Sequence, residues 1–357
     1  MRRCKRCLLP AVAPGADLDR SGICAFCRNL DPGQDARKET IREQYAKDLE
    51  TALRTCRGNG RYDALLCLSG GKDSLYLLYR LIVDYGLKVL AFTTDVNIPD
   101  IAWSNMRRTI AKLGCDHLIY RPPELFYRKL FRHLLQNQEE RGAVYTVSYV
   151  YAPLFEGDAL QVAMEKDIPL VLAGYSPGQP EPERMAYEFS RKLICETDWT
   201  PPALKSVSSF TAADLTRFWN PRRYRSGTAF PRYLAPFHAW PYDQDQIMKK
   251  VVELELVRNA KHASPIHSNY PINWLLMYSD LMNFGYNPYA PEFSALIRSG
   301  KADRRYWRIM APVVDSMIRK RYGPGREVLR SMRWLDLSAD ELRITLPRGA
   351  YDPVVTA

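Results

Sequence analysis

The stretch that decides the fold reads YDALLCLSGGKDS and covers residues 62–74. Residues 62–68 are a short apolar run, which predicts a buried β-strand, and residues 74–85 have the periodicity of an amphipathic helix that stops at Gly86. The glycines between them let backbone N–H groups face an anion, because no Cβ stands in the way. The positive end of the following helix points to the same place, and Lys72 adds a charge. The stretch therefore predicts phosphate binding, although the G-x-x-x-x-G-K-[ST] spacing of a Walker A loop is absent.

The alternation of strands and helices continues toward the C-terminus. Further strands are predicted at 87–94, 116–120 and 169–173, and helices at 101–113, 123–138 and 152–166. Such alternation predicts an α/β fold, with a parallel sheet covered by helices on both faces. Ligands of these sheets bind at the carboxyl ends of the strands.

Three regions are expected along the chain. Residues 1–57 hold a cysteine-rich element and a helix at 35–57, and residues 58–200 hold the strand–helix alternation. Residues 201–357 carry helical periodicity at 243–256, 272–284 and 302–321. This last region is expected to be mostly helical and to serve substrate binding or the association of two copies in a homodimer.

Composition limits the class of protein. The 357 residues suggest about two domains at roughly 150 residues each. No apolar run approaches the ~20 residues that cross a bilayer, and the N-terminus lacks an apolar signal segment, so we expect a cytoplasmic protein without membrane contact. The net charge is 51 − 40 = +11, which favours anionic partners such as nucleotides, nucleotide sugars or RNA. A basic surface that only maintains solubility is the alternative reading.

Four of the eight cysteines form two C-x-x-C pairs near the N-terminus, Cys4 with Cys7 and Cys24 with Cys27. This spacing is typical of a zinc site with four thiolate ligands. The alternative of two disulfides requires an oxidising compartment, which the absence of a secretion signal disfavours. We expect one structural Zn²⁺.

In its context between a strand and a helix, the hexapeptide SGGKDS resembles the PP-loop of N-type ATP pyrophosphatases, the adenine nucleotide alpha hydrolase-like (HUP-like) superfamily. The resemblance implies that ATP is cleaved between its α and β phosphates, that a carbonyl-type oxygen is adenylated, and that a nitrogen or sulfur nucleophile displaces AMP. It also implies Mg²⁺, with Asp73 as a ligand and Lys72 at the leaving group. Pyrophosphate would be held by Ser69, Gly70, Gly71, Lys72, Asp73 and Ser74, and the adenosine pocket would be lined by Phe92, Asp95 and Gly174. An equally supported alternative is that Asp95 only begins the following helix.

A closer resemblance joins the cysteine pairs to the loop. CKRC at 4–7, Pro10, Gly15, Gly22 and CAFC at 24–27, followed by the PP-loop, are similar to the opening of N-acetyl sugar amidotransferases. FGY at 284–286 and SALIRSG at 294–300 also resemble segments of that family. Two segments that surround the acceptor in that family differ here, DVNIPD at 95–100 and GYSPGQ at 174–179. The resemblance therefore does not establish an amino sugar as the acceptor.

The layout also resembles PP-loop thiolation enzymes, which act on tRNA or make small molecules such as 6-thioguanine. Enzymes that carry persulfide need a reactive cysteine near AMP. Cys195 follows the strand that ends before Gly174 and is our candidate, whereas Cys115 lies at a helix-to-strand junction, normally the opposite edge of the sheet. An inert, buried cysteine is the alternative. The cysteine pair of many tRNA thiolases is not evident. His262, His267 and Asn269 are weaker candidates for substrate contact.

These observations predict an ATP-dependent transferase that replaces a carbonyl oxygen with sulfur on a small molecule such as a purine nucleotide. A cysteine desulfurase would supply the sulfur. Amidotransfer to an N-acetyl sugar, with ammonia from a separate glutaminase, is the first alternative. Thiolation of tRNA is the second. A zinc-bearing scaffold without catalysis is the non-enzymatic alternative, which the complete hexapeptide disfavours.

Overall fold

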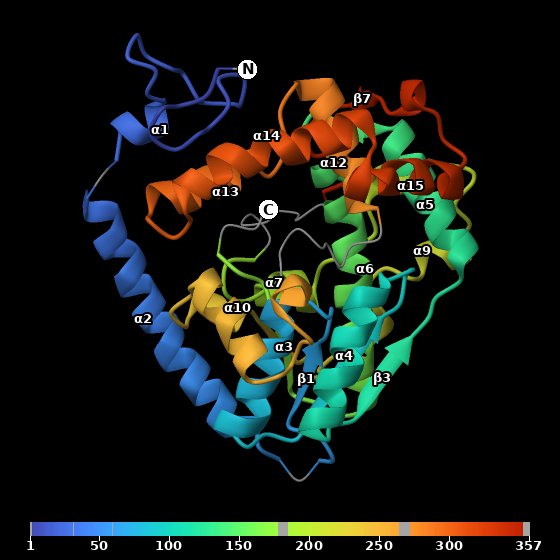
Figure 1. Ribbon diagram of the computed structural model, residues 1–357. Coiled ribbons are helices and arrows are strands. Elements are labelled where there is room, and N and C mark those ends of the chain that lie inside the picture. Colours follow the sequence, from blue (N-terminus) through green and yellow to red (C-terminus); the bar gives the residue numbers. More distant parts are fainter. Residues whose placement is uncertain (1, 31, 59, 178–184, 264–271, 353–357) are drawn as a thin grey trace. The chain divides into compact units, whose positions relative to one another are not determined.

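The computed structural model describes residues 2–30, 32–58, 60–177, 185–263 and 272–352. The chain forms two compact units, each assembled from separate segments (Figure 1). Unit 1 contains Met1–Lys38, Tyr127–Ser148 and Ile272–Gly349, and unit 2 contains Glu39–Phe126, Tyr149–Pro271 and Ala350–Ala357. Every helix in the described ranges is too short or too polar to span a membrane.

Unit 2 is built on a five-stranded parallel sheet of order β3-β2-β1-β5-β6. The strands are β1 (Ala64–Cys67), β2 (Val89–Thr94), β3 (His117–Tyr120), β5 (Leu170–Ala173) and β6 (Arg232–Leu234). The predicted α/β class with a parallel sheet is confirmed. The fifth strand, β6, was not expected, because its three residues are too short to show a period of two.

Alternate residues of the central strands enter two different cores, as the pleat of a strand requires. Leu66 joins a core with helices α2 (Pro32–Thr55), α3 (Lys72–Tyr79), α4 (Asp100–Leu113) and α10 (Gln244–Glu253). Leu65 joins a second core with helices α6 (Ala143–Glu165) and α7 (Arg191–Cys195). Helices therefore cover both faces of the sheet, which explains why its strands are apolar throughout. We call these the α3 face and the α6 face.

Two helices start earlier than their sequence pattern indicates. Helix α3 begins at Lys72, two residues before Ser74, and continues into a π-helical turn at Arg80–Asp84. Helix α6 begins at Ala143 and contains Pro153, although only 152–166 has a helical pattern. The first turns of α6 are rich in β-branched and aromatic residues, which favour strands when judged locally.

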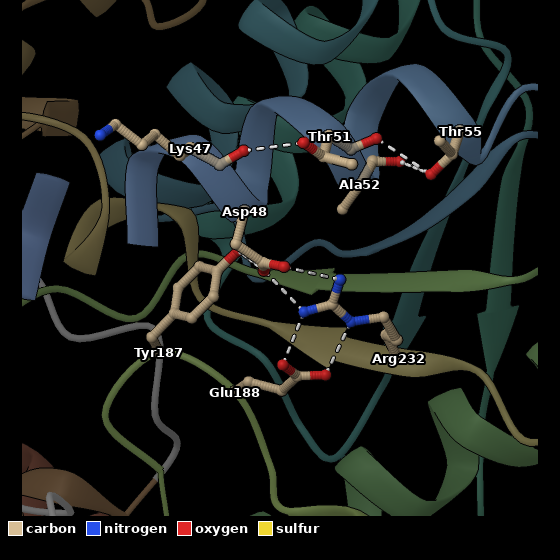
Figure 2. A network of polar contacts seen from close by, with 8 residues as sticks. All are labelled: Lys47, Asp48, Thr51, Ala52, Thr55, Tyr187, Glu188 and Arg232. Carbon is tan, nitrogen blue, oxygen red and sulfur yellow. Dashed lines mark hydrogen bonds and ion pairs between the residues drawn. The ribbon is translucent and has the colours of Figure 1, made fainter. Parts of the chain in front are cut away.

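A polar network fastens the edge strand β6 to α2 (Figure 2). The Arg232 guanidinium donates to Glu188 at 2.6 and 2.8 Å and to Asp48 at 2.6 Å, and the Tyr187 hydroxyl donates to Asp48 at 2.8 Å. Burial opposes ionisation of Asp48, but Arg232 and Tyr187 together lower its pKa. The network links residues 184 positions apart and holds α2 on the sheet.

Unit 1 is mostly helical. Its helices include α1 (Ala25–Arg28), α12 (Asn273–Phe284), α13 (Ala290–Arg298), α14 (Arg304–Lys320) and α15 (Arg326–Leu335), and β4 (Gln138–Glu139) pairs in parallel with β7 (Ile344–Leu346). Buried Asp280 on α12 accepts hydrogen bonds from the backbone N–H groups of Ala143 (2.5 Å) and Val144 (3.0 Å) at the start of α6.

The remaining elements of the described chain belong to both units. They are α5 (Glu124–Gln136), most of which belongs to unit 1, α8 (Pro202–Lys205), α9 (Ala212–Leu215), α11 (Ala260–Ala263) and 3₁₀ turns at Pro221–Arg223, Pro236–His238, Gly323–Gly325 and Ala339–Glu341.

Candidate active site

The order of the strands fixes where a ligand binds in unit 2. The chain proceeds outward from β1 through β2 to β3, then returns to the other side of β1 with β5 and β6. The order therefore reverses between β1 and β5, and loops at the carboxyl ends of such a strand pair diverge and leave room for a ligand. The hexapeptide 69–74 follows β1, and Gly174 follows β5. The structure thus brings the predicted loop and Gly174 to this reversal point.

Both segments approach neighbouring backbone so closely that only glycine fits. Gly70 has φ +76°, and a Cβ there would lie 2.5 Å from the carbonyl oxygen of Ala102. A Cβ on Gly174 would lie 2.9 Å from the backbone nitrogen of Ser74. The two glycines allow the loop to pack against α4 and against the end of β5, so side-chain bulk is excluded where an anion must meet backbone N–H groups.

The first turn of α3 is ordered by short hydroxyl contacts. Gly71 is the N-cap residue and offers no side chain to the free N–H groups of the first turn. The Ser74 hydroxyl donates to the Gly71 carbonyl at 3.0 Å and lies 3.1 Å from the Ser69 hydroxyl. The helix terminus therefore presents N–H groups and a partial positive charge, the arrangement that binds phosphate in many proteins.

Lys72 and Asp73 form a buried charged pair with Tyr242. Lys72 Nζ lies 2.7 Å from Asp73 Oδ2 and 3.3 Å from the Tyr242 hydroxyl, which donates to Asp73 Oδ1 at 3.2 Å. Burial disfavours the charged form of Lys72, but Asp73 and Tyr242 outweigh it and raise the pKa of the ammonium. Burial also raises the pKa of Tyr242 to about 12, so this hydroxyl stays protonated. A positive charge is held at the start of α3 at neutral pH.

Sequence reasoning missed Tyr242 and Asn105. The Asn105 amide donates to the Gly70 carbonyl and to the His262 carbonyl, both at 3.0 Å, and its oxygen lies 3.2 Å from His262 Nδ1. Asn105 thereby fixes the loop from α4. His262 is half-buried and supports the loop through Asn105, while His267 and Asn269 lie outside the described residues.

The predicted adenosine-pocket residues occupy different environments. Phe92 is buried in the core on the α6 face, and its carbonyl oxygen accepts from the N–H of Leu68, just before the loop, at 2.7 Å. Asp95 is buried just beyond β2, where its carboxylate accepts from Arg121 at 2.6–2.7 Å. The N–H of Ile98 also approaches Asp95 at 3.4 Å, a turn geometry typical of helix entry.

The cysteines outside the N-terminal pairs are not activated by their surroundings. Cys195 ends α7 and packs partly buried against the core on the α6 face, and burial raises the pKa of its thiol despite Arg191 nearby. Burial also raises the pKa of Cys56 and of Cys115 to about 11, and that of Cys67 to about 12. A low-pKa thiolate, which a persulfide carrier needs, is favoured at none of these four positions.

The four N-terminal cysteines of unit 1 converge. Their sulfur atoms all lie within 4.8 Å of one another, with 3.8 Å between Cys4 and Cys27 and 3.5 Å between Cys7 and Cys24. All four side chains are buried. Burial opposes ionisation of Cys4, but hydrogen bonds from the backbone of Cys7, Cys24 and Arg6 lower its pKa to about 6. Arg298 donates to Cys7 Sγ at 3.4 Å. The cluster fits a metal ion.

No protein-family profile matches the sequence. No curated protein matches it either. Solved structures similar to the chain include the U34-tRNA thiolase NcsA from Methanococcus maripaludis with its [4Fe-4S] cluster, at 13% identity and a TM-score of 0.35, covering 97% of this chain and 90% of that one. NMN synthetase from Francisella tularensis is similar at 12% identity and a TM-score of 0.36, covering 85% and 97%. NH₃-dependent NAD synthetase from Campylobacter jejuni is similar at 14% identity and a TM-score of 0.33, covering 82% and 96%.

The sheet and the site agree with the resemblance found in the sequence. A parallel sheet whose order reverses beside SGGKDS, with helices on both faces, is the arrangement that the PP-loop resemblance implies. The resemblance to the adenine nucleotide alpha hydrolase-like superfamily therefore extends from the hexapeptide to its place in the fold.

Proposed function

We propose that the protein is an ATP-dependent transferase that adenylates a carbonyl oxygen of an acceptor, releases pyrophosphate, and then exchanges the activated oxygen for another atom while AMP leaves. The observation that carries the proposal is the glycine loop at the strand reversal, with its uncapped helix terminus and buried Lys72. These groups are aimed where a polyphosphate gains charge as it departs.

Each residue of the loop has a role in this proposal. The backbone N–H groups that follow Gly70 bind the β and γ phosphates, and Lys72 neutralises the leaving pyrophosphate. Mg²⁺ would be held by Asp73, whose carboxylate is an oxygen ligand of the kind this ion prefers, and would neutralise phosphate charge. Asp73 already accepts hydrogen bonds from Lys72 and Tyr242. When Mg²⁺ binds Asp73, the Lys72 ammonium would therefore have to leave this carboxylate and bind a phosphate oxygen instead.

The products of ATP cleavage test the adenylation step. With acceptor present, we expect AMP and pyrophosphate, and Lys72→Ala and Asp73→Asn should each lose most of this activity. The exposed Lys166→Ala is the matched control and should retain it. Formation of ADP and phosphate contradicts the proposal.

For the transferred atom, sulfur is our first candidate, because the two segments that would surround an amino-sugar acceptor are replaced at 95–100 and 174–179. Nitrogen is the second candidate, and the observation that favours it is the raised thiol pKa at Cys56, Cys67, Cys115 and Cys195. If Cys195 carries persulfide, Cys195→Ser should abolish product and Cys115→Ser should not. A product mass with NH in place of O, formed with ammonium, decides for amidotransfer.

The acceptor is proposed to be a small molecule such as a purine nucleotide, and one observation favours RNA as the second candidate. Unit 1 holds 25 Lys and Arg against 14 Asp and Glu, so 25 − 14 = +11, whereas unit 2 holds 26 of each and 26 − 26 = 0. The entire net charge lies on the unit with the cysteine cluster. A polyanion bound there would release counterions, so tRNA affinity should fall steeply with salt. If tRNA does not bind even at low salt, the small molecule is the acceptor that we retain.

We propose zinc for the cysteine cluster. A tetrahedral ion with Zn–S bonds of about 2.3 Å separates its sulfur ligands by about 3.8 Å, close to the two sulfur distances of this cluster. A [4Fe-4S] cluster binds each cysteine through a different iron and needs wider spacing. Metal analysis of purified protein should give about one zinc per chain, and stoichiometric iron contradicts the assignment.

A further inference from the structure

A second group of polar side chains gathers at the carboxyl ends of β2 and β3, on the α6 face. Thr94 and Tyr120 are the last residues of these strands and are partners in the parallel ladder. Each lies two residues after a residue that faces the core on the α6 face, Phe92 in β2 and Leu118 in β3, so both are on this face of the sheet. Each of the two holds one charged side chain from elsewhere in unit 2.

Thr94 holds a carboxylate. Its hydroxyl donates to Oδ2 of Asp158, on α6, at 3.0 Å, and Oδ1 accepts no hydrogen bond among the described residues. Asp158 is half-buried. Burial raises the pKa of Asp158 to about 7, against the opposing effects of Thr94 and Arg217. The site therefore contains a carboxylate that has one oxygen without a hydrogen bond among the described residues and a pKa close to neutral pH.

Tyr120 positions a guanidinium. Arg217 Nη1 donates to the Tyr120 hydroxyl at 3.3 Å, and the guanidinium lies over the Phe126 ring at 4.9 Å. The Nε–H of Arg217 is buried and has no partner among the described residues. Arg217 attracts the charge of Asp158, yet no ion pair joins them within the described part of the chain. A buried donor without a partner costs free energy, which a bound acceptor atom recovers.

We propose that Thr94, Asp158 and Arg217 form the acceptor subsite of the transferase proposed above, and that this subsite binds a lactam, a cyclic –NH–C(=O)– group. The lactam N–H donates to Oδ1 of Asp158, and its carbonyl oxygen accepts from Nε–H of Arg217. This pairing satisfies the free acceptor and the free donor together. Asp158 and Arg217 interact electrostatically without forming an ion pair among the described residues, so one offers an acceptor and the other a donor. Together they match the donor–acceptor edge of a lactam, whereas a hydroxyl or an amine supplies only half of it.

The same contacts assist adenylation. When the carbonyl oxygen forms its bond to the α phosphorus and the bond to pyrophosphate breaks, the N–H proton moves to Asp158. The N–H bonding electrons become the C=N bond of the adenylated product, so charge balances without another reactant. A base acts best when its pKa is close to the working pH, and Asp158 meets this condition.

The test uses the full chain and two small probes that differ by one methyl group, 2-pyridone and N-methyl-2-pyridone, titrated at pH 8 by ligand-observed NMR. The wild type should bind 2-pyridone at least about tenfold more tightly, since only it offers the N–H. Asp158→Asn and Arg217→Met should each weaken 2-pyridone by a similar factor. The exposed Asp167→Asn and Arg222→Met are matched controls and should leave it unchanged.

The pH dependence separates recognition from a structural role. Affinity of the wild type for 2-pyridone should rise between pH 6 and pH 8 as Asp158 ionises, and Asp158→Asn should remove this rise. The groups that interact electrostatically with Asp158 are Arg217, Tyr151 and Cys67, of which the last two have a pKa raised by burial and do not ionise in this range. If Asp158→Asn fails to fold, Thr94→Val is measured instead: loss of the Thr94 hydrogen bond should raise the pKa of Asp158 and move the rise in affinity to higher pH, and an unshifted rise overturns the role of Asp158.

Equal affinity for the two probes, absence of binding, or full affinity in Asp158→Asn overturns the lactam subsite. The titration involves no ATP cleavage, so its outcome is independent of the adenylation chemistry. Conversely, ADP as the product of ATP cleavage overturns the proposed function and leaves the titration interpretable.

Discussion

Gly174→Ala probes the contact that joins the end of β5 to the phosphate loop. The added Cβ would lie 2.9 Å from the Ser74 nitrogen and 3.0 Å from its Cα. Both atoms belong to the backbone of α3, so no side chain can rotate away. Ordinary contact begins at 3.4 Å, which means that the two segments must separate by 3.4 − 2.9 = 0.5 Å.

This displacement is large relative to hydrogen-bond geometry. A backbone N–H to phosphate bond near 2.9 Å would lengthen to about 3.4 Å, beyond the usual limit of about 3.2 Å. Loss of one hydrogen bond to a charged group costs about 1.5–3 kcal/mol, or roughly ten- to a hundredfold in affinity. Overpacking should also lower the free energy of unfolding by about 1–3 kcal/mol.

Calorimetric titration with Mg-ATP and urea unfolding measure the two effects. Gly58→Ala is the matched control, because the nearest atom to its Cβ would be 3.9 Å away and its backbone needs no positive φ. We expect a loss of ATP affinity in Gly174→Ala and no change in Gly58→Ala. Wild-type affinity and stability in Gly174→Ala would refute the argument that this contact shapes the loop.

Three further predictions concern stability. Cys24→Ser should release the metal and lower the melting temperature before it changes ATP affinity, because metal binding and folding are coupled; thermal scans with and without chelator measure this. Burial raises the pKa of Asp280 to about 7, above its unfolded value, so its contribution to stability is complete below about pH 4 and is lost as pH rises through 7; melting temperatures from pH 5 to pH 8 should fall more steeply in the wild type than in Asp280→Asn. Arg232→Met should lower the free energy of unfolding by only about 1 kcal/mol, since its partners are more than 30% exposed, and a loss of folding would contradict this.

The sequence was sufficient wherever one segment determines its own structure. The run before Ser69 is apolar at each strand position from Ala64 to Cys67, and the loop glycines follow it directly. The two C-x-x-C pairs likewise carry their own turns. Strands β1, β2, β3 and β5 and the cysteine cluster were therefore predictable, because local pattern and tertiary burial agree.

The parts that were not predictable depend on distant residues. Tyr242 reaches Lys72 from 170 positions away, and Asn105 reaches His262 across 157. The start of α6 is capped by Asp280, 137 positions from Ala143, which stabilises a helix where the local composition favours a strand. The Thr94–Asp158 pair arises in the same way. No spacing rule encodes such contacts, since only the folded sheet brings them together.

The two proposed halves of the site lie on opposite faces of one sheet, and this placement agrees with the chemistry. Helix α3 and Lys72, which would hold the leaving pyrophosphate, cover one face, whereas Thr94 and Asp158 lie toward the other. Displacement at phosphorus requires the attacking and leaving oxygens to be roughly in line on opposite sides of the α phosphorus. An acceptor held by Asp158 and Arg217 would approach from the α6 face while pyrophosphate leaves toward α3. The strand order reverses between β1 and β5, and the carboxyl ends of these strands are where a nucleotide would be bound between the two groups.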